Sequence, residues 1–313
     1  MIVHLIDGTY ELFRHFYGLR RFTKGDRPLG AVAGVLNGVL EMIEGGAGYL
    51  GVATDHVIES FRNGLWEGYK TGEGIEPALR AQFQPLEDGL IGMGVTVWPM
   101  VELEADDALA SAAALASKDP RVQKVCIWTP DKDLAQCVRA DHVVQVDRKS
   151  NAIRDADSVR AKFGVTPERI PDYLALVGDT SDGYPGISGI GPKGAASLIE
   201  RFGGLEDFPP EILGERKSLA LLFKRLATLR NDAPLFSDVG SLKWHGATPD
   251  FAAIASKLGD PRILARAEKA LQLTQAPEAG TAKAFVLKAK STKAAKKRPA
   301  LQPTASSGPT KQR

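Results

Sequence analysis

The stretch GDTSDGYPGISGIGPKGAA, Gly178 to Ala196, places two aspartates directly before a glycine-rich turn. Part of it, from Gly189 to Gly194, fits the dinucleotide-binding pattern G-x-G-x-x-G. That pattern requires a preceding strand, whereas residues 172–177 favour a helix. The two carboxylates would also repel a pyrophosphate. The stretch therefore indicates a helix, a hairpin turn and a second helix rather than a nucleotide site.

A hairpin of this kind has the properties of a site for a nucleic-acid backbone. Glycine reaches positive φ and lets the main chain approach a partner closely, and the candidates are Gly189, Gly191 and Gly194. The following helix would present free N–H groups and Lys193 toward a phosphate. Such contacts hold a DNA backbone without reading its sequence. On this stretch alone, a plain connection between two packed helices stays open as the alternative.

The N-terminal half alternates short apolar runs with helical patterns. The runs predicted to be strands cover residues 2–6, 49–53, 95–101, 125–128 and 142–146. Helical patterns lie between them, notably over residues 31–43 and 105–118. This alternation predicts an α/β fold with a mostly parallel central sheet and helices on both faces.

Acidic residues follow the first four of these runs. They are Asp7, Asp55, Glu104, Asp106, Asp107, Asp131 and Asp133. In an open parallel sheet, ligands bind outside the carboxyl ends of the strands, so we expect these side chains to converge at one edge. Asp179 and Asp182 can join them from the glycine-rich stretch. A single acid in the first turn of a helix, such as Asp107, is also explained by the helix dipole.

So many carboxylates in one place would resist ionising together. Divalent cations remove that conflict, and oxygen ligands without a cysteine or histidine cluster suit Mg²⁺ or Mn²⁺ rather than zinc. Two such ions close together are a common device for phosphodiester cleavage. The sequence therefore predicts two Mg²⁺ or Mn²⁺ ions and a nucleic-acid substrate.

The charge of the chain is unevenly distributed. The 313 residues have a formal net charge of +2. Residues 274–313 contain nine lysines or arginines and one glutamate, so they carry +8 and the rest carries −6. This composition, without apolar periodicity, predicts a disordered tail. The tail either solubilises the protein or attracts nucleic acid loosely.

The remaining composition excludes several classes of protein. Two cysteines, Cys126 and Cys137, make no disulfide framework. The N-terminus lacks the features of a signal peptide, and no apolar run reaches the length that spans a bilayer. We expect a cytoplasmic monomer with no membrane partner.

The sequence resembles the 5′ nuclease superfamily, which includes flap endonucleases and the 5′-3′ exonuclease domain of bacterial DNA polymerase I. The matching pieces run in family order from residue 1 to about residue 272. They include LIDGTYELFRHFYGL, ATDHVIESFRNGLWEGYK, ELEADDALAS, TPDKDLAQCV and the region from FGVTPERIP to FGGLED. The resemblance implies a PIN-like nuclease core over residues 1–158 with a helical arch over about 56–90. It also implies a helical DNA-binding subdomain with the helix-hairpin-helix (H3TH) motif over 159–273, followed by the tail over 274–313.

The resemblance also assigns roles to individual residues. It implies one metal held by Asp7, Asp55 and Asp106 with Glu104 and Asp107 close by, and a second held by Asp131, Asp133 and Asp182 with Asp179 in the outer shell. Arg62 and Lys70 would act on the scissile phosphate, and Arg14 and Lys193 would contact other phosphates. Backbone carbonyls of Ile187 and Ile190 would bind a potassium ion.

The implied activity is metal-dependent hydrolysis of DNA near 5′ ends or 5′ flaps, in a nuclease without a polymerase domain. Two departures from relatives stand out: Gly183-Tyr184 replaces a common Asn-Leu, and the predicted arch is less basic than usual. A PIN-type RNase and a DNA-junction binding protein with weak catalysis are the alternatives. The helical region after residue 159 disfavours the first, and the retained carboxylates disfavour the second.

Overall fold

A computed structural model describes residues 1–20 and 28–275 of the chain. The predicted basic tail over 274–313 lies outside the described residues from position 276 onward. Among the described helices, none is both long and apolar enough to cross a membrane.

One six-stranded sheet forms the centre of the molecule. Its strands are β1 (Ile2–Asp7), β2 (Leu50–Asp55), β3 (Thr96–Met100), β4 (Lys124–Trp128), β5 (Val143–Val146) and β6 (Ile153–Arg154). They lie in the order β3-β2-β1-β4-β5-β6. The first five are parallel and β6 runs antiparallel to β5. The predicted mostly parallel sheet is confirmed, and β6 was missed because a two-residue strand has no periodicity.

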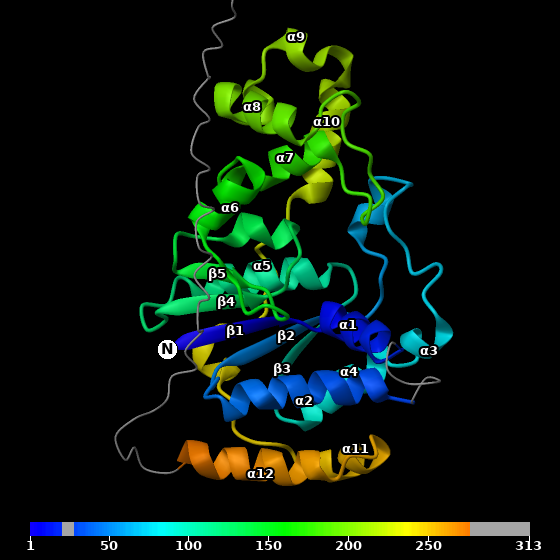
Figure 1. Cartoon of the computed structure of the whole chain (residues 1–313), viewed down its shortest axis with the longest axis vertical. Coiled ribbons are helices and arrows are strands. Elements are labelled where there is room, and N and C mark those ends of the chain that lie inside the picture. Colours follow the sequence, from blue (N-terminus) through cyan, green and yellow to red (C-terminus); the bar gives the residue numbers. More distant parts are fainter. Residues whose placement is uncertain (21–27, 276–313) are drawn as a thin grey trace, which may run out of the picture.

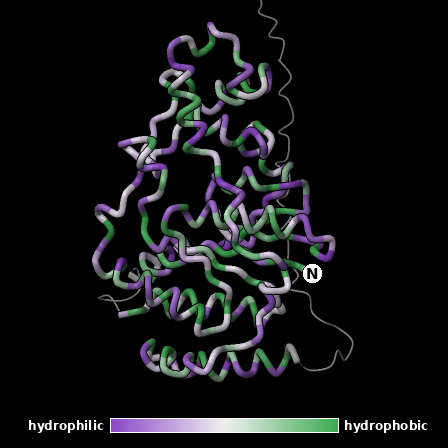
Figure 2. Tube along the Cα trace, turned by 180° about the vertical axis from the view of Figure 1, so that it is seen from behind, coloured by the Kyte–Doolittle hydropathy of each residue, from purple (hydrophilic) through white to green (hydrophobic). Residues whose placement is uncertain are grey.

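Helices cover both faces of this sheet (Figure 1). One face carries α1 (Gly8–Arg20), α2 (Gly30–Glu44) and α4 (Phe83–Gly92), and the other carries α5 (Ala105–Ala116). Successive strand residues point to opposite faces, so Leu5 packs with α5 while Ile6 packs with α2. The alternation of apolar and polar residues along α12, at the bottom of Figure 2, reflects one buried and one solvated side. This packing fixes the carboxyl ends of the strands as one rigid edge.

A helical subdomain with its own core stands over one end of the sheet (Figure 1). Its elements are α6 (Ala156–Phe163), η3 (Pro167–Arg169), α7 (Ile170–Val177), α8 (Pro192–Phe202), η4 (Leu205–Asp207), α9 (Pro210–Leu213), η5 (Gly214–Arg216) and α10 (Lys217–Ala227). The longest of these helices, α8 and α10, each bury one face against α7 or its neighbours. The hairpin predicted from the glycine-rich stretch joins α7 to α8.

The C-terminal boundary predicted for this subdomain is wrong. After η6 (Val239–Leu242), the chain returns to the α/β core, where α11 (Phe251–Lys257) packs against α4 and α12 (Arg262–Gln275) packs beneath α2 (Figure 1). Phe251, Ile263 and Ala267 are fully buried in the same core as α2. Residues 251–275 therefore belong to the α/β core, because the outer face of α2 is apolar and needs a covering layer.

The predicted helical arch is also not a helical arch in this structure. Residues 56–82, the connecting segment, contain only the single turns η1 (Phe61–Gly64) and α3 (Pro77–Arg80) between bends and turns. Gly68, Gly72 and Gly74 lie in its middle, and glycine weakens a helix interior. The segment leaves the end of β2, runs up to the helical subdomain and returns to α4 (Figure 1).

His4, in the centre of β1, gives the fold a dependence on pH. The side chain is buried and its Nδ1 accepts a hydrogen bond from Trp128 Nε1 at 3.0 Å. Burial, reinforced by Arg148, lowers the pKa of His4 from 6.5 to about 4. Because the unfolded chain binds a proton below pH 6.5 and the folded chain does not, this group costs stability as the pH falls from about 6.5 toward 4.

We therefore expect the difference in unfolding free energy between wild type and His4→Gln to be constant above about pH 7 and to shift by about 3 kcal/mol in favour of the variant between pH 6.5 and 4. Urea unfolding in EDTA across this pH range measures it. A difference that stays flat down to pH 4 would show that His4 is not held neutral in the fold.

Candidate metal centre and nucleic-acid interface

A cavity of about 370 Å³ opens at the carboxyl edge of the sheet. Its acidic lining residues are Asp7, Asp55, Asp106, Asp131 and Asp182. Four of them follow β1, β2, β3 and β4, and the fifth comes from the hairpin between α7 and α8. The structure thus brings together carboxylates that are up to 175 positions apart in the chain, as predicted from the ends of the strands.

The carboxylates are aimed by hydrogen bonds to the surrounding main chain. Asp7 accepts from the Tyr10 N–H at 2.8 Å and from the Thr129 hydroxyl at 3.0 Å. Asp55 accepts from the Ala105 N–H, at the start of α5, at 2.8 Å. Each of these bonds uses one lone pair of an oxygen, so both carboxylates keep lone pairs that could bind a cation.

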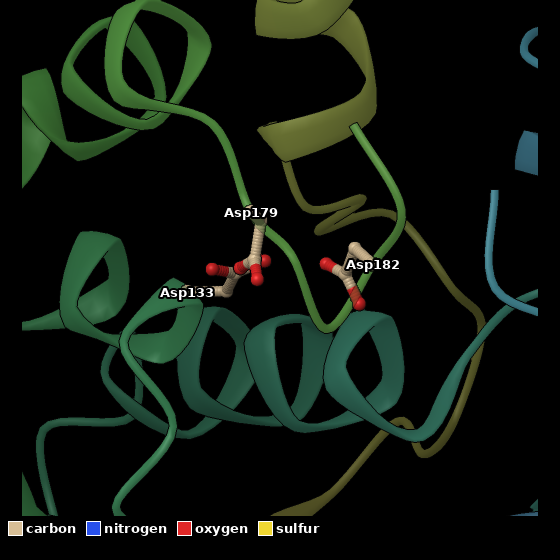
Figure 3. A group of neighbouring side chains, drawn as sticks. All are labelled: Asp133, Asp179 and Asp182. Atoms are coloured by element: carbon tan, nitrogen blue, oxygen red, sulfur yellow. The ribbon is translucent and has the colours of Figure 1, made fainter. Parts of the chain in front are cut away.

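A second group of carboxylates lies beside this cavity. Asp133, Asp179 and Asp182 each offer an oxygen within 4.8 Å of the other two (Figure 3). Asp133 Oδ1 is buried without a hydrogen-bond partner among the described residues. An orphaned carboxylate oxygen inside an all-oxygen cluster fits a hard divalent cation, whose preferred ligands are carboxylates. The donor set of this structure therefore suits the predicted metal.

The pKa values of these groups reflect the crowding. Burial raises the pKa of Asp7 to about 7, with Asp55 and Asp131 adding to the effect. Burial likewise raises the pKa of Asp106 and Asp133, and the Asp131 carboxylate is the next cause in both. Without cations, the cluster resists full ionisation.

Two lysines supply positive charge inside the cluster. Lys70 Nζ lies 2.8 Å from Glu104 Oε2 and 3.0 Å from Asp182 Oδ1, and it lines the cavity. Burial alone would lower the pKa of Lys70, but Glu104 and Asp182 raise it, so the ammonium stays charged. Lys132 pairs with Asp179 at 2.5 Å. Lys132 was not predicted from the sequence, although its place between Asp131 and Asp133 was a signal.

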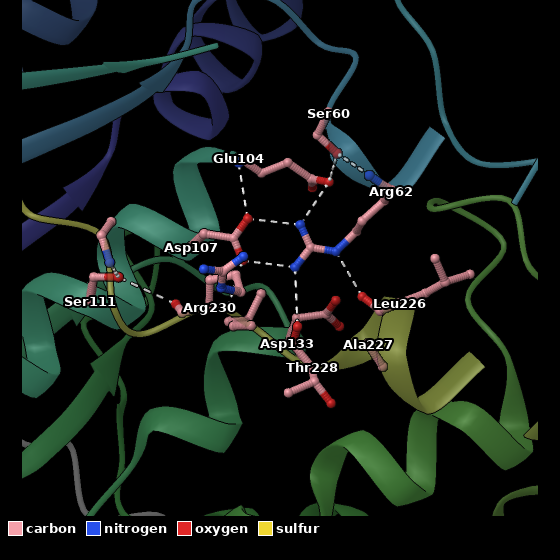
Figure 4. Close-up of polar contacts among 12 residues, drawn as sticks. Ser60, Arg62, Glu104, Asp107, Ser111, Asp133, Leu226, Ala227, Thr228 and Arg230 are labelled. Carbon is pink, nitrogen blue, oxygen red and sulfur yellow. Dashed lines mark hydrogen bonds and ion pairs between the residues drawn. The ribbon is translucent and has the colours of Figure 1, made fainter. Parts of the chain in front are cut away.

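The structure contradicts the phosphate contact predicted for Arg62. Its side chain is 1% exposed. The guanidinium binds both oxygens of Asp107, at 2.7 and 2.8 Å, and also Glu104 at 3.0 Å (Figure 4). The remaining donors go to the carbonyls of Leu226 and Thr228. With its donors engaged by protein groups, Arg62 is a positioning residue behind the metal centre.

The place predicted for Asp107 beside the first metal is also wrong, because protein donors engage both of its oxygens. It is fully buried, and its oxygens also accept from the N–H groups of Glu104 and Arg230 at 3.0 and 2.8 Å. No oxygen is left for a metal, so the structural explanation of an acid in the first turn of α5 holds for Asp107. Glu104 is a partial case, because its carboxylate is shared among Arg62, Ser60 and Lys70.

A close backbone contact, which we call the glycine clasp, joins the connecting segment to the hairpin. Gly183 has φ of +82°, and a Cβ at this position would lie 1.9 Å from the Gly68 carbonyl oxygen. Trp66 Nε1 donates to the Gly183 carbonyl at 3.1 Å, and the Lys70 N–H donates to the Asp182 carbonyl at 3.0 Å. The clasp requires glycine at position 183, and it holds the main chain of Lys70 against that of Asp182.

The hairpin is exposed, as a nucleic-acid contact requires. Gly189 has φ of +83° with open space around it, whereas Gly191, the residue before α8, is extended at φ −90°. Lys193 and Gly194 are exposed in the first turn of α8. The Ile187 carbonyl accepts the Ile190 N–H at 3.0 Å within the turn. Gly189, not Gly191, is therefore the glycine that the backbone requires.

Arg14 lies on α1, one turn beyond Tyr10 of the metal cavity. Its side chain is 31% exposed and paired with Glu11. Arg14 lines a second cavity rather than the one that holds the carboxylates. It is thus near the centre and partly accessible, but it does not reach into it.

Two families match adjoining parts of the chain. Residues 2–164 match the 5′-3′ exonuclease N-terminal resolvase-like domain, and residues 165–250 match the 5′-3′ exonuclease C-terminal SAM fold. The chain belongs to the 5′-3′ exonuclease family. The end of the second match at residue 250 agrees with the return of α11 and α12 to the core of this 5′-3′ exonuclease family member.

Relatives are about one third identical to the chain over the aligned residues. A protein named 5′-3′ exonuclease from Buchnera aphidicola subsp. Baizongia pistaciae is 33% identical over 248 residues, covering 73% of this chain and 81% of the relative. DNA polymerase I of Pseudomonas aeruginosa is 34% identical over 259 residues, covering 76% of this chain. The match spans only 28% of that polymerase.

Solved structures support the fold. T5 5′-exonuclease with bound zinc ions has a TM-score of 0.58 at 18% identity, covering 88% of this chain and 100% of that one. The catalytic core of Rad2 in complex with a DNA substrate has a TM-score of 0.54 at 14% identity, covering 86% of this chain and 91% of that one. At such identities the likeness concerns the fold alone.

Proposed function

We propose that this member of the 5′-3′ exonuclease family hydrolyses DNA phosphodiester bonds near 5′ ends or 5′ flaps with the help of two divalent ions. The observation that carries the proposal is the convergence of seven aspartates at one edge of the sheet. They are Asp7, Asp55, Asp106, Asp131, Asp133, Asp179 and Asp182. Family membership and the exposed hairpin support the same substrate.

The proposed ligands fall into two sets. Asp7, Asp55 and Asp106 would hold one Mg²⁺ or Mn²⁺ ion, and Asp131, Asp133 and Asp182 the other, with Asp179 in an outer position. Bound divalent ions of this kind activate a water molecule and stabilise the leaving oxygen of a phosphodiester. The orphaned oxygen of Asp133 and the raised pKa values supply the physical reason for the ions to bind.

Lys70 is the residue of this chain best placed to act on the phosphate itself. Its ammonium stands at the cavity wall, where it forms ion pairs with the carboxylates of Glu104 and Asp182. When cations satisfy those carboxylates, the ammonium is released to pair with the scissile phosphate, and a flexible lysine can follow the charge as it moves. Glu104 would stay in place because Arg62 and Ser60 hold its carboxylate. The Lys70 ammonium would therefore move only a short distance to reach the phosphate.

The hairpin would hold the duplex while the edge of the sheet cuts. The free N–H groups at the start of α8 and the Lys193 ammonium offer a phosphate site, and α8 has no acidic residue in its first turn. The carbonyls of Ile187 and Ile190 remain our proposed ligands for a potassium ion. The proposed metal ligands Asp179 and Asp182 and the proposed phosphate site at the start of α8 therefore lie on one short segment between α7 and α8.

The two alternatives are a PIN-type RNase and a junction-binding protein with weak catalysis. A minimal PIN domain needs no helical subdomain such as residues 156–227. A protein that only binds junctions has no need for the orphaned buried carboxylate oxygen of Asp133, which is costly without a cation.

The proposal is tested with labelled DNA substrates: a 5′-flap duplex, a blunt duplex, a single strand and the matching RNA. We expect cleavage of the flap or the duplex end in Mg²⁺ and complete loss in EDTA, restored by excess Mg²⁺. Binding to the flap without cleavage under all metal conditions would favour the junction-binding protein. Preferred cleavage of the RNA would favour the PIN-type RNase.

Gly189 should matter for duplex binding and Gly191 should not. A valine at Gly189 would be forced into positive φ, which is unfavourable for a β-branched residue, whereas Gly191 has ordinary extended dihedrals and open space. We expect Gly189→Val to weaken duplex binding about tenfold and Gly191→Ala to leave it within about twofold. Fluorescence anisotropy with a duplex and a single strand measures this. Equal losses on both DNA forms would indicate general damage instead.

A further inference from the structure

A second cavity, of about 520 Å³, lies next to the metal centre on the face covered by α1 and α2. Arg14 and His15 from α1, Asn37 and Glu41 from α2, and Arg148 after β5 line it, and we call it the arginine cavity. Tyr10 lines the metal cavity and Arg14, one helical turn further along α1, lines the arginine cavity. The two cavities are therefore neighbours, yet the metal chemistry uses neither His15 nor Arg148.

The arginine cavity accounts for two glycines in the middle of α2. Gly34 and Gly38 lie one turn apart, and glycine in a helix interior weakens the helix relative to alanine. A Cβ at Gly34 would lie 2.4 Å from His15 Nδ1, and a Cβ at Gly38 would lie 3.1 Å from Arg148 Nη2. Because α2 has no side chain at these two positions, the imidazole of His15 and the guanidinium of Arg148 can lie against its backbone.

The two arginines of the arginine cavity differ in their partners. Arg14 is paired with Glu11 and also donates to His15 Nε2 at 2.9 Å. Arg148 donates to the Gly38 carbonyl and lies over the Trp128 ring. Within residues 1–20 and 28–275, no carboxylate forms an ion pair with Arg148. Burial lowers the pKa of Arg148. The charges of Glu11 and Glu41 raise it, although neither carboxylate forms an ion pair with the guanidinium.

A half-buried guanidinium without an anionic partner is unfavourable. Arginine is also the side chain whose planar donors best match a phosphate. We propose that the arginine cavity binds a phosphate group of the DNA substrate, with Arg148 as the principal partner and Arg14 and His15 beside it. The choice of DNA as the source of the phosphate rests on the proposed function. The binding of a phosphate group by Arg148 does not.

Arg148→Gln tests the proposal, because glutamine keeps a polar side chain that can donate hydrogen bonds but removes the charge. Arg121→Gln is the matched control, since Arg121 precedes β4 at the opposite edge of the sheet. In EDTA, so that no cutting occurs, we expect Arg148→Gln to weaken binding to a nicked duplex about tenfold and the control to leave it within about twofold. A loss confined to a 5′-phosphorylated strand would identify the terminal phosphate, and an equal loss on a 5′-hydroxyl strand would identify an internal one. Unchanged binding on both strands would overturn the proposal.

Inorganic phosphate gives a readout that is independent of cleavage and of DNA. We expect the ring signals of His15 to shift in NMR spectra on titration with phosphate, and those of exposed His245 to stay unchanged. The His15 shift should disappear in Arg148→Gln. Cleavage-competent protein with no His15 shift and no effect of Arg148→Gln would sink this proposal alone. A His15 shift in protein that cuts no DNA would sink only the proposed function.

Discussion

Asp182→Asn is expected to lower the single-turnover cleavage rate by at least about 100-fold at saturating DNA. Asp182 lies in the group of three carboxylates with Asp133 and Asp179 and also contacts Lys70 at 3.0 Å. Asparagine keeps the shape and removes one negative charge from the proposed metal ligands. The same variant should require more Mg²⁺ for half-maximal rate, because the remaining carboxylates attract the ion less.

The matched control for this variant is Asp88→Asn, since Asp88 is exposed on α4 and accepts a hydrogen bond from Gln84. It should cleave at the wild-type rate. Quenched-flow or gel assays over a Mg²⁺ series measure both variants. A rate for Asp182→Asn within about threefold of wild type at high Mg²⁺ would remove Asp182 from the ligands and with it the two-ion assignment.

Arg62→Ala should destabilise the protein by about 3–5 kcal/mol, the range for breaking a buried ion pair. The substitution leaves Asp107 fully buried without its bidentate partner and removes a donor from Glu104. It also frees the carbonyls of Leu226 and Thr228, which attach the end of α10 to the core. Urea unfolding monitored by circular dichroism gives the free energy of unfolding.

Two comparisons show whether the loss comes from the buried pair. Arg62→Met combined with Asp107→Asn removes both charges and should recover a large part of the stability. Arg230→Ala breaks an exposed pair with Asp232 and should change the unfolding midpoint little. If Arg62→Ala instead kept full stability and lost only cleavage rate, the phosphate role predicted from the sequence would be right after all.

The sheet and its acidic edge could be predicted because they depend on local patterns. Short apolar runs that end in Asp or Glu specify both a strand and the edge at which its last residue lies. Five predicted strands match β1 to β5, and the carboxylates of Asp7, Asp55, Asp106, Asp131 and Asp182 meet in one cavity as expected. The positions of the acidic residues relative to the apolar runs were sufficient to predict the strands and the edge.

The features that depend on pairing between distant residues could not be predicted. Nothing near Asp107 or Arg62 in the sequence reveals that they bind each other, because 45 positions separate them and either could have faced solvent. The same holds for α12, whose apolar side could have packed on either domain. The glycines of the connecting segment, by contrast, were a visible signal against a helical arch that the family resemblance outweighed.

The return of α11 and α12 to the underside of α2 decides where the protein can be shortened. The helical subdomain is an insertion in the sequence of the core, entered after β6 and left before α11. A truncated form that stops at residue 250, where the family match ends, would strip the cover from the apolar side of α2 and expose residues such as Leu40 and Ile43, now fully buried. Such a form would aggregate although every proposed metal ligand is present. The shortest form that keeps this side of α2 covered therefore extends through α12, far beyond Asp182, the last of the proposed metal ligands.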